Sequence, residues 1–171
     1  MAGLTLVACG GNDRPEPKQV GVDTLTVAEK TAEFALFPSD GKVENAEAFI
    51  ERDFLGVPSL DYVYKVDYES DGARFKLFMT RDVSGVKYIN FRVQAGSAHD
   101  LQNAPASIVF DDNYSFMYEH PEYGTIIAGL KNNRLVGILG LDNENQTNLL
   151  AAWVASLPAM ENSSKPTVEN K

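Results

Sequence analysis

The chain has 171 residues, and its 24 acidic and 15 basic side chains give it a formal net charge of −9. A charge of this sign disfavours attraction to phosphate backbones, so we expect no nucleic-acid partner. Hydrophobic residues make up 44% of the chain, which excludes disorder of its body, and a single cysteine excludes an intramolecular disulfide.

An apolar run near the N-terminus ends at this cysteine. The run Leu6-Val7-Ala8-Cys9 is followed by Gly-Gly-Asn-Asp and further polar residues. It resembles the lipobox of bacterial lipoproteins. The resemblance implies that a diacylglycerol is joined to the sulfur of Cys9, that the peptide is cut before this residue, and that residues 9–23 form a flexible tether. The lipid would then be the protein's contact with the membrane.

The same resemblance implies a place in the bacterial cell envelope. Gly10 follows the cysteine, where inner-membrane lipoproteins of enterobacteria carry an aspartate. The expected location is therefore the outer membrane, facing the periplasm.

Only eight residues precede Cys9, and none of them is charged. A full signal peptide has a basic segment and an apolar stretch of roughly 7 to 15 residues. We therefore expect residues 1–8 to be the remnant of a signal peptide. The alternative is that residues 1–9 form a short apolar strand and that the thiol of Cys9 is buried in the core.

Residues 24–158 are expected to form a single domain, and residues 159–171 a disordered polar tail. At its start, residues 24–37 fit a helix or, over 33–37, a strand. Apolar residues then recur at helical spacing from Val43 to Phe54, which predicts an amphipathic helix.

Over residues 60–80, bulky apolar and aromatic side chains recur at every second position, which is the period of a strand. The pattern is interrupted by Asp71-Gly72, the preferred pair for a type I′ turn. This pattern predicts an antiparallel hairpin. Residues 86–95 are expected to form a third strand that directs three apolar side chains into the core, namely Ile89, Phe91 and Val93.

The remaining elements are a loop at 96–105 and two short strands at 108–110 and 114–118. A second hairpin is predicted to pair residues 125–130 with 134–141 across Asn132-Asn133, since asparagine tolerates the positive φ of such a turn. A helix over 144–157 should begin at Asn143, with Gln146 three residues on.

These elements predict an α+β fold in which an antiparallel sheet of about five to seven strands carries one or two helices packed on one face. The order of the long hairpins and the terminal helix resembles that of PsbP-like domains. No motif accompanies this resemblance, so it implies no residue roles.

The sequence contains no serine-hydrolase elbow, no Walker phosphate loop and no dinucleotide-binding glycine motif, and we expect no cofactor. Two clusters hold side chains capable of chemistry. Asp111-Asp112-Asn113 with Glu119-His120-Pro121-Glu122 offers oxygen and imidazole ligands for a divalent cation, and His99-Asp100 offers a base. Neither spacing matches a known metal signature, so a turn and a surface histidine are the favoured interpretations.

Three tyrosines, Tyr62, Tyr64 and Tyr68, share one face of the first hairpin with Val66. Such a row is either a recognition surface or the inner face of the sheet, and core packing is favoured.

Two functions remain open. One is a lipid-anchored, non-enzymatic binding or adaptor module for an envelope protein or small ligand. The other is an envelope enzyme or metal-dependent accessory factor with a site around His99, Asp112 and His120.

Overall fold

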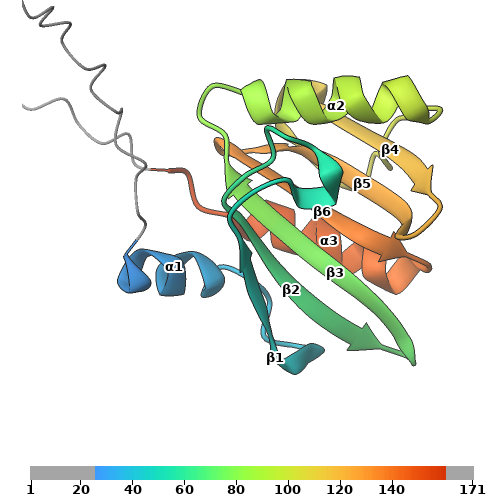
Figure 1. Cartoon of the computed structure of the whole chain (residues 1–171). Coiled ribbons are helices and arrows are strands. Elements are labelled where there is room, and N and C mark those ends of the chain that lie inside the picture. The colour runs from blue at the N-terminus through green and yellow to red at the C-terminus, as the bar shows by residue number, and fades with distance from the viewer. Residues whose placement is uncertain (1–25, 161–171) are drawn as a thin grey trace, which may run out of the picture.

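A computed structural model of the chain describes residues 26–160. Its centre is one open antiparallel sheet of six strands in the order β1-β2-β3-β6-β5-β4. The strands are β1 (Lys42–Ile50), β2 (Val63–Ser70), β3 (Ala73–Arg81), β4 (Ser115–His120), β5 (Gly124–Lys131) and β6 (Arg134–Leu141). The helices are α1 (Val27–Phe34), α2 (Val86–Ala98) and α3 (Glu144–Ser156), and Figure 1 shows α2 and α3 on opposite sides of the sheet.

Both predicted hairpins are confirmed. β2 pairs with β3 from Tyr64↔Met79 to Ser70↔Ala73, and β5 pairs with β6 as far as Lys131↔Arg134. The turn residues Asp71 and Gly72 have φ values of 52° and 76°, and Asn132 and Asn133 have values of 50° and 60°. Left-handed backbone at both central positions is what a type I′ turn requires. Local turn chemistry therefore sets the register of four of the six strands.

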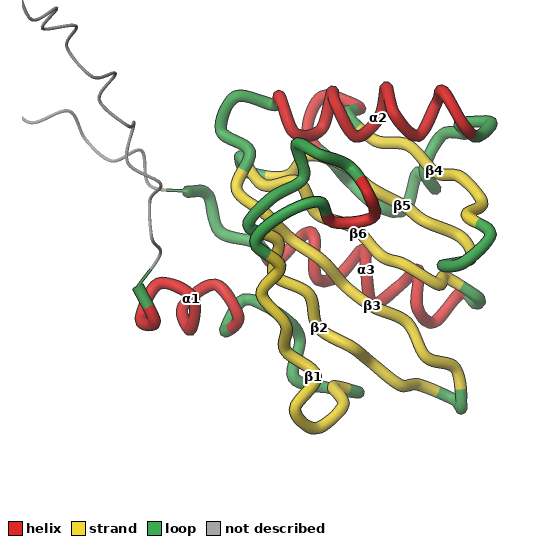
Figure 2. The backbone as a smooth tube through the Cα atoms, in the orientation of Figure 1, coloured by secondary structure: helices red, strands yellow, loops and turns green. Residues whose placement is uncertain are grey.

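Apolar side chains fill a layer on each face of the sheet. On one face, Leu150, Trp153 and Val154 of α3 pack against alternate residues of the strands, together with the aromatic residues that end α1. On the other face, Tyr88 and Phe91 of α2 pack over a second set of strand residues. Figure 2 shows the strands lying between these helices. The predicted α+β fold is confirmed, and α2 adds a covered second face.

The segment predicted as a helix over 43–54 is a strand instead. Residues 42–50 form the edge strand β1, which pairs with β2 at Lys42↔Tyr68 and again from Glu47↔Val66. The register shifts between these pairs, and Asn45 has a positive φ of 56° within the shifted segment. The irregularity spoils the alternation that marks a strand, and hydrogen bonding to β2 outweighs the helical spacing.

The segment predicted as a strand over 86–95 is the helix α2. Its buried residues are Tyr88, Phe91 and Ala95, which share one face at helical spacing. Of the three residues expected in the core, Phe91 is buried, whereas Ile89 and Val93 are 53% and 68% exposed. The short strand expected at 108–110 is also wrong, since this segment is a loop whose Ile108 and Phe110 are buried.

α1 begins at a capping box that the sequence analysis missed. The backbone N–H of Thr26 donates to the Glu29 carboxylate at 2.7 Å, and the N–H of Glu29 donates to the Thr26 hydroxyl at 3.3 Å. Near its other end, the carboxylate of Glu33 is buried beside the guanidinium groups of Arg81 and Arg134, at 3.4 and 3.5 Å. This charged cluster fastens α1 to β3 and β6.

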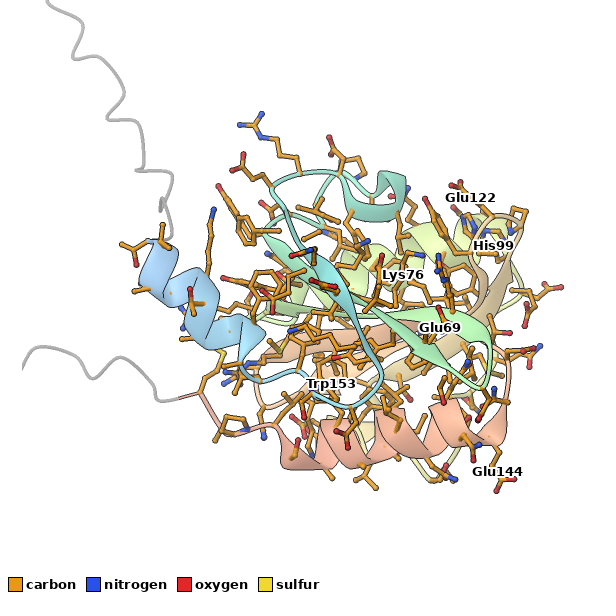
Figure 3. The ribbon with its side chains drawn as sticks, turned by 90° about the horizontal axis from the view of Figure 1, so that it is seen from below. Glu69, Lys76, His99, Glu122, Glu144 and Trp153 are labelled. Atoms are coloured by element: carbon orange, nitrogen blue, oxygen red, sulfur yellow. The ribbon has the colours of Figure 1, made fainter. Side chains whose placement is uncertain are left out.

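α3 begins at Asn143 as predicted, because the Asn143 side-chain oxygen accepts the N–H of Gln146 at 3.1 Å. The Gln146 side chain in turn accepts the N–H of Asp142 at 2.7 Å. Figure 3 shows Trp153 at this helix, where its indole N–H donates to the carbonyl of Leu36 at 2.8 Å. Over residues 26–160, no helix combines the length and hydropathy needed to cross a bilayer.

Candidate functional site

The proposed lipidation site, Cys9, lies outside the described residues, as do the whole tether and the residues from 161 onward. The candidate residues within residues 26–160 fall into two groups at opposite ends of α2. The histidines lie at its C-terminal end, and Asp112 lies in a cleft at its N-terminal end.

The structure brings the two histidines together. His99 is the C-terminal cap of α2, and His120 ends β4. Their ring centroids are 5.5 Å apart, and His99 also lies 4.9 Å from the ring of Tyr118. Figure 3 shows His99 close to Glu122, in the turn that follows β4. Tertiary packing therefore unites residues that are 21 positions apart in the sequence.

The hydrogen bonds of His120 limit what this pair can do. Its Nδ1 accepts the backbone N–H groups of Glu122 and Tyr123, at 3.1 and 3.3 Å. An Nδ1 that accepts hydrogen bonds carries no proton, so in the neutral ring the proton is on Nε2. Neither nitrogen of this tautomer offers a free lone pair to a metal ion. The arrangement instead describes a histidine that closes the turn between β4 and β5.

Asp112 does not join the histidines. It lies in the short 3-10 segment Asp111–Asn113, beside the start of α2, whereas His99 lies just beyond the other end of this 13-residue helix. At 1.5 Å per residue the two ends are about 20 Å apart. Glu119 also has a local partner, since it accepts the Thr125 hydroxyl at 2.6 Å. Within residues 26–160, no three metal-ligating side chains form a group able to hold an ion.

A cleft of about 290 Å³ opens at the N-terminal end of α2. The Asp82 carboxylate on its wall is only 4% exposed, and its two oxygens accept the backbone N–H groups of Lys87 at 3.1 Å and Tyr88 at 2.7 Å. These are among the N–H groups that a helix leaves without partners in its first turn. Asp82 therefore starts α2, and its carboxylate is fully engaged in doing so.

The other acidic groups of the cleft are also partly engaged. Asp111 accepts the N–H of Asn132 at 2.6 Å and lies 3.3 Å from the ammonium group of Lys131. Asp112 is exposed and has a positive φ of 46°, so it forms a turn as the sequence predicted. Tyr88 packs edge-on against Tyr114 at 5.6 Å, and burial raises the pKa of the Tyr88 hydroxyl. The cleft thus combines aromatic and aliphatic side chains with acidic ones in its lining.

An exposed apolar surface continues from this cleft along the outside of α2. We define the α2 surface as the four side chains Val83, Val86, Ile89 and Val93, which are 66%, 51%, 53% and 68% exposed. Val83 and Ile89 also line the cleft. With 100° between successive residues, the three helical members lie opposite the buried face that Phe91 marks. Because its exposed apolar side chains lie together, we take the α2 surface as the candidate binding surface.

Sequence analysis missed this surface, because it assigned Ile89 and Val93 to the core. The signal was present in the spacing of three residues, since Tyr88, Phe91 and Ala95 recur as on one face of a helix. In a helix whose Phe91 face packs on the sheet, Ile89 and Val93 lie on the opposite side and point away from the sheet.

The tyrosine row packs as the favoured interpretation predicted. Tyr64 and Tyr68 are 2% and 0% exposed in the layer beneath α3, whereas Tyr62 precedes β2 and is partly exposed. Burial raises the pKa of Tyr64 to about 12, and the nearby Glu33 carboxylate adds to this shift. The row therefore belongs mainly to the core.

Comparisons of the chain with family models, with curated proteins and with solved structures find no match.

Proposed function

We propose that this protein is a lipid-anchored protein of the bacterial cell envelope, held by a lipid on Cys9 at the outer membrane and facing the periplasm. Its domain acts as a non-enzymatic binding or adaptor module. The support for the anchor is the run Leu6-Val7-Ala8-Cys9 and the polar residues that follow it. Two or three acyl chains on one cysteine suffice for stable attachment.

The support for a binding role is the α2 surface. Four apolar side chains that are each more than half exposed lie together beside a cleft, while the opposite face of the same helix is packed on the sheet. Leaving such side chains in water is unfavourable, by about 25 cal/mol for each Å² of apolar area. A partner that covers them gains this free energy.

The anchor leaves the α2 surface accessible. α1, the first described helix, ends in Phe34, which packs with the layer beneath α3, on the side of the sheet opposite α2. The 16 residues between Cys9 and Thr26 span at most about 60 Å. A domain of this size has a radius of gyration of about 14 Å, so the domain is free to turn this surface in any direction.

Metabolic labelling with a palmitate analogue tests the anchor. The parent protein should be labelled and the Cys9→Ala variant should not be. An unlabelled, full-length parent protein in cells that label other lipoproteins would rule out the anchor.

Photocrosslinking in cells tests the binding role. A crosslinking amino acid at Ile89 should give a defined adduct, whereas the same residue at Ala155, which is exposed on α3, should not. Equal adduct patterns at the two positions would count against a specific binding surface.

The double variant His99→Ala/His120→Ala tests the enzyme or metal alternative. We expect this variant to keep both its fold and its function. Loss of function with the fold preserved would favour the alternative.

A further inference from the structure

The exposed apolar residues of α2 are spaced as in the seam between two helices. Val86, Ile89 and Val93 follow the spacing i, i+3, i+7, and the next seam position is Gly96. The stripe is narrow, because the exposed polar residues Asn90 and Ser97 border it on one side and Arg92 borders it on the other. At 100° per residue, its three apolar members span about 60° of the helix circumference. This geometry fits one partner helix.

A membrane surface fits the stripe less well. Helices that lie in a bilayer interface have a broad apolar face with Trp, Phe or Leu and a polar face rich in Lys and Arg. α2 exposes only valine and isoleucine on this side, and Lys87 and Arg92 are its only basic residues. The ammonium group of Lys87 is already bound at 2.8 Å to the Asp61 carboxylate.

The stripe is complementary to itself when two copies run antiparallel. Pairing Val86 with Val93 of a second copy brings the two Ile89 side chains together near a two-fold axis. In the same register, Gly96 of one copy lies near the N-terminal end of the other copy's α2, which Val83 precedes in the chain. A two-fold interface of this kind uses the same patch on both copies. Antiparallel helices also bring the opposite ends of their dipoles together.

The charge pattern permits this pairing. Residues 83–98 contain no aspartate or glutamate, in a chain with 24 acidic residues. The helix itself therefore brings no carboxylate to the contact, and the acidic groups Asp111 and Asp112 lie in the cleft beside it. Repulsion between the two net charges remains, and dissolved salt screens it.

We propose that the α2 surface binds the α2 surface of a second copy of this chain, with the two helices antiparallel about a two-fold axis near Ile89. This inference deepens the proposed binding role by naming the partner. A 13-residue helix is about 20 Å long, so the contact is smaller than the roughly 800 Å² per partner of a standard interface. The dimer is therefore weak in dilute solution, and anchoring on a membrane strengthens it by raising the effective concentration.

Sedimentation velocity of the purified full chain with Cys9→Ala tests the pairing without a lipid. The weight-average mass should rise towards that of a dimer between micromolar and millimolar concentrations, and the dimer should be tighter at higher salt. Ile89→Glu should weaken association at least about tenfold, because two carboxylates would meet near the axis. Ala155→Glu, a matched change on the outer face of α3, should associate as the parent does.

Disulfide trapping tests the register. Cys9 is the only cysteine, so Ile89→Cys or Ala155→Cys in the Cys9→Ala background gives a chain with one thiol. Oxidation should link two Ile89→Cys chains and leave Ala155→Cys chains unlinked. Both positions are exposed, and unchanged circular dichroism would show that the variants fold.

The proposal is overturned if the parent stays monomeric up to millimolar concentration, or if Ile89→Glu associates as strongly as the parent. Binding of the Cys9→Ala chain to phosphatidylglycerol vesicles that depends on Ile89, without self-association, would identify the membrane as the occupant instead. These results are separate from the anchor. A monomeric chain with a labelled Cys9 refutes only the pairing, and a dimeric chain with an unlabelled Cys9 refutes only the lipid.

Discussion

Asp82 should control the stability of α2, the helix that carries the proposed binding surface. Its carboxylate is 4% exposed and accepts the N–H groups of Lys87 and Tyr88. The change Asp82→Ala removes both acceptors and leaves these two donors unpaired in the first turn. Asp82→Asn keeps one acceptor oxygen and removes the negative charge. Asp112→Asn is the matched control, because Asp112 lines the same cleft and is exposed.

The expected magnitudes follow from these contacts. Loss of a side-chain cap lowers the free energy of unfolding by about 0.5–2 kcal/mol, and loss of a carboxylate near a helix N-terminus lowers it by a further 0.3–1 kcal/mol or so. We therefore expect the free energy of unfolding to fall by about 2 kcal/mol in Asp82→Ala and by about 1 kcal/mol in Asp82→Asn. The exposed control should change by less than about 0.5 kcal/mol. For a domain of this size, 2 kcal/mol lowers Tm by about 7 °C.

Urea denaturation followed by circular dichroism measures these differences. Amide hydrogen exchange localises them, because protection should fall first at the amides of Lys87 and Tyr88. The reasoning is refuted if Asp82→Ala is no less stable than Asp112→Asn, or if exchange in the first turn of α2 is unchanged.

Three further changes test the packing of the sheet by the same denaturation assay. The methyl group added by Gly137→Ala would overlap the backbone oxygen of Ile127 on the neighbouring strand. We therefore expect the free energy of unfolding to fall by about 3 kcal/mol, and a variant as stable as the parent would contradict this close approach. Burial raises the pKa of Tyr118 from 10 to about 12, so its neutral form contributes stability that is complete below pH 10 and is lost as the pH rises to about 12. Tyr118→Phe should therefore lose less stability than the parent between pH 9 and pH 12 or so, and equal losses would argue against this origin. Arg134→Met removes a partner of the buried Glu33 carboxylate and should lower stability by about 3 kcal/mol; adding Glu33→Gln should restore part of it, and a further loss in the double variant would contradict the pairing.

The parts of the fold that sequence predicted correctly have local causes. Asp71-Gly72 and Asn132-Asn133 are residue types that favour left-handed backbone, and the alternation of side chains before and after each turn supplies the two faces of each hairpin. The start of α3 is equally local, because Asn143 and the N–H of Gln146 are three residues apart. These signals need no knowledge of the rest of the chain.

The wrong elements are those whose environment is set by distant residues. Residues 42–50 are a strand because β2 offers a free edge to pair with, which the spacing of their apolar residues does not reveal. Residues 86–98 are a helix because Asp82 caps them and because aromatic rings on β3 and β4 form a surface for Phe91, with Phe78 at 6.3 Å and Phe116 at 5.2 Å. The candidate site was affected in the same way. Chain folding brought His99 to His120 and left Asp112 at the other end of α2.

The sequence by itself determined the turns, the helix cap, the excess of acid and the cysteine motif, since each depends on neighbouring residues or on composition alone. Only the tertiary structure decided which apolar residues are covered. Ile89 and Phe91 are two positions apart and similarly hydrophobic, yet the sheet covers Phe91 while Ile89 is left in water. Burial depends on which surfaces of the whole chain meet, so the surface proposed for binding becomes visible only when the core is complete.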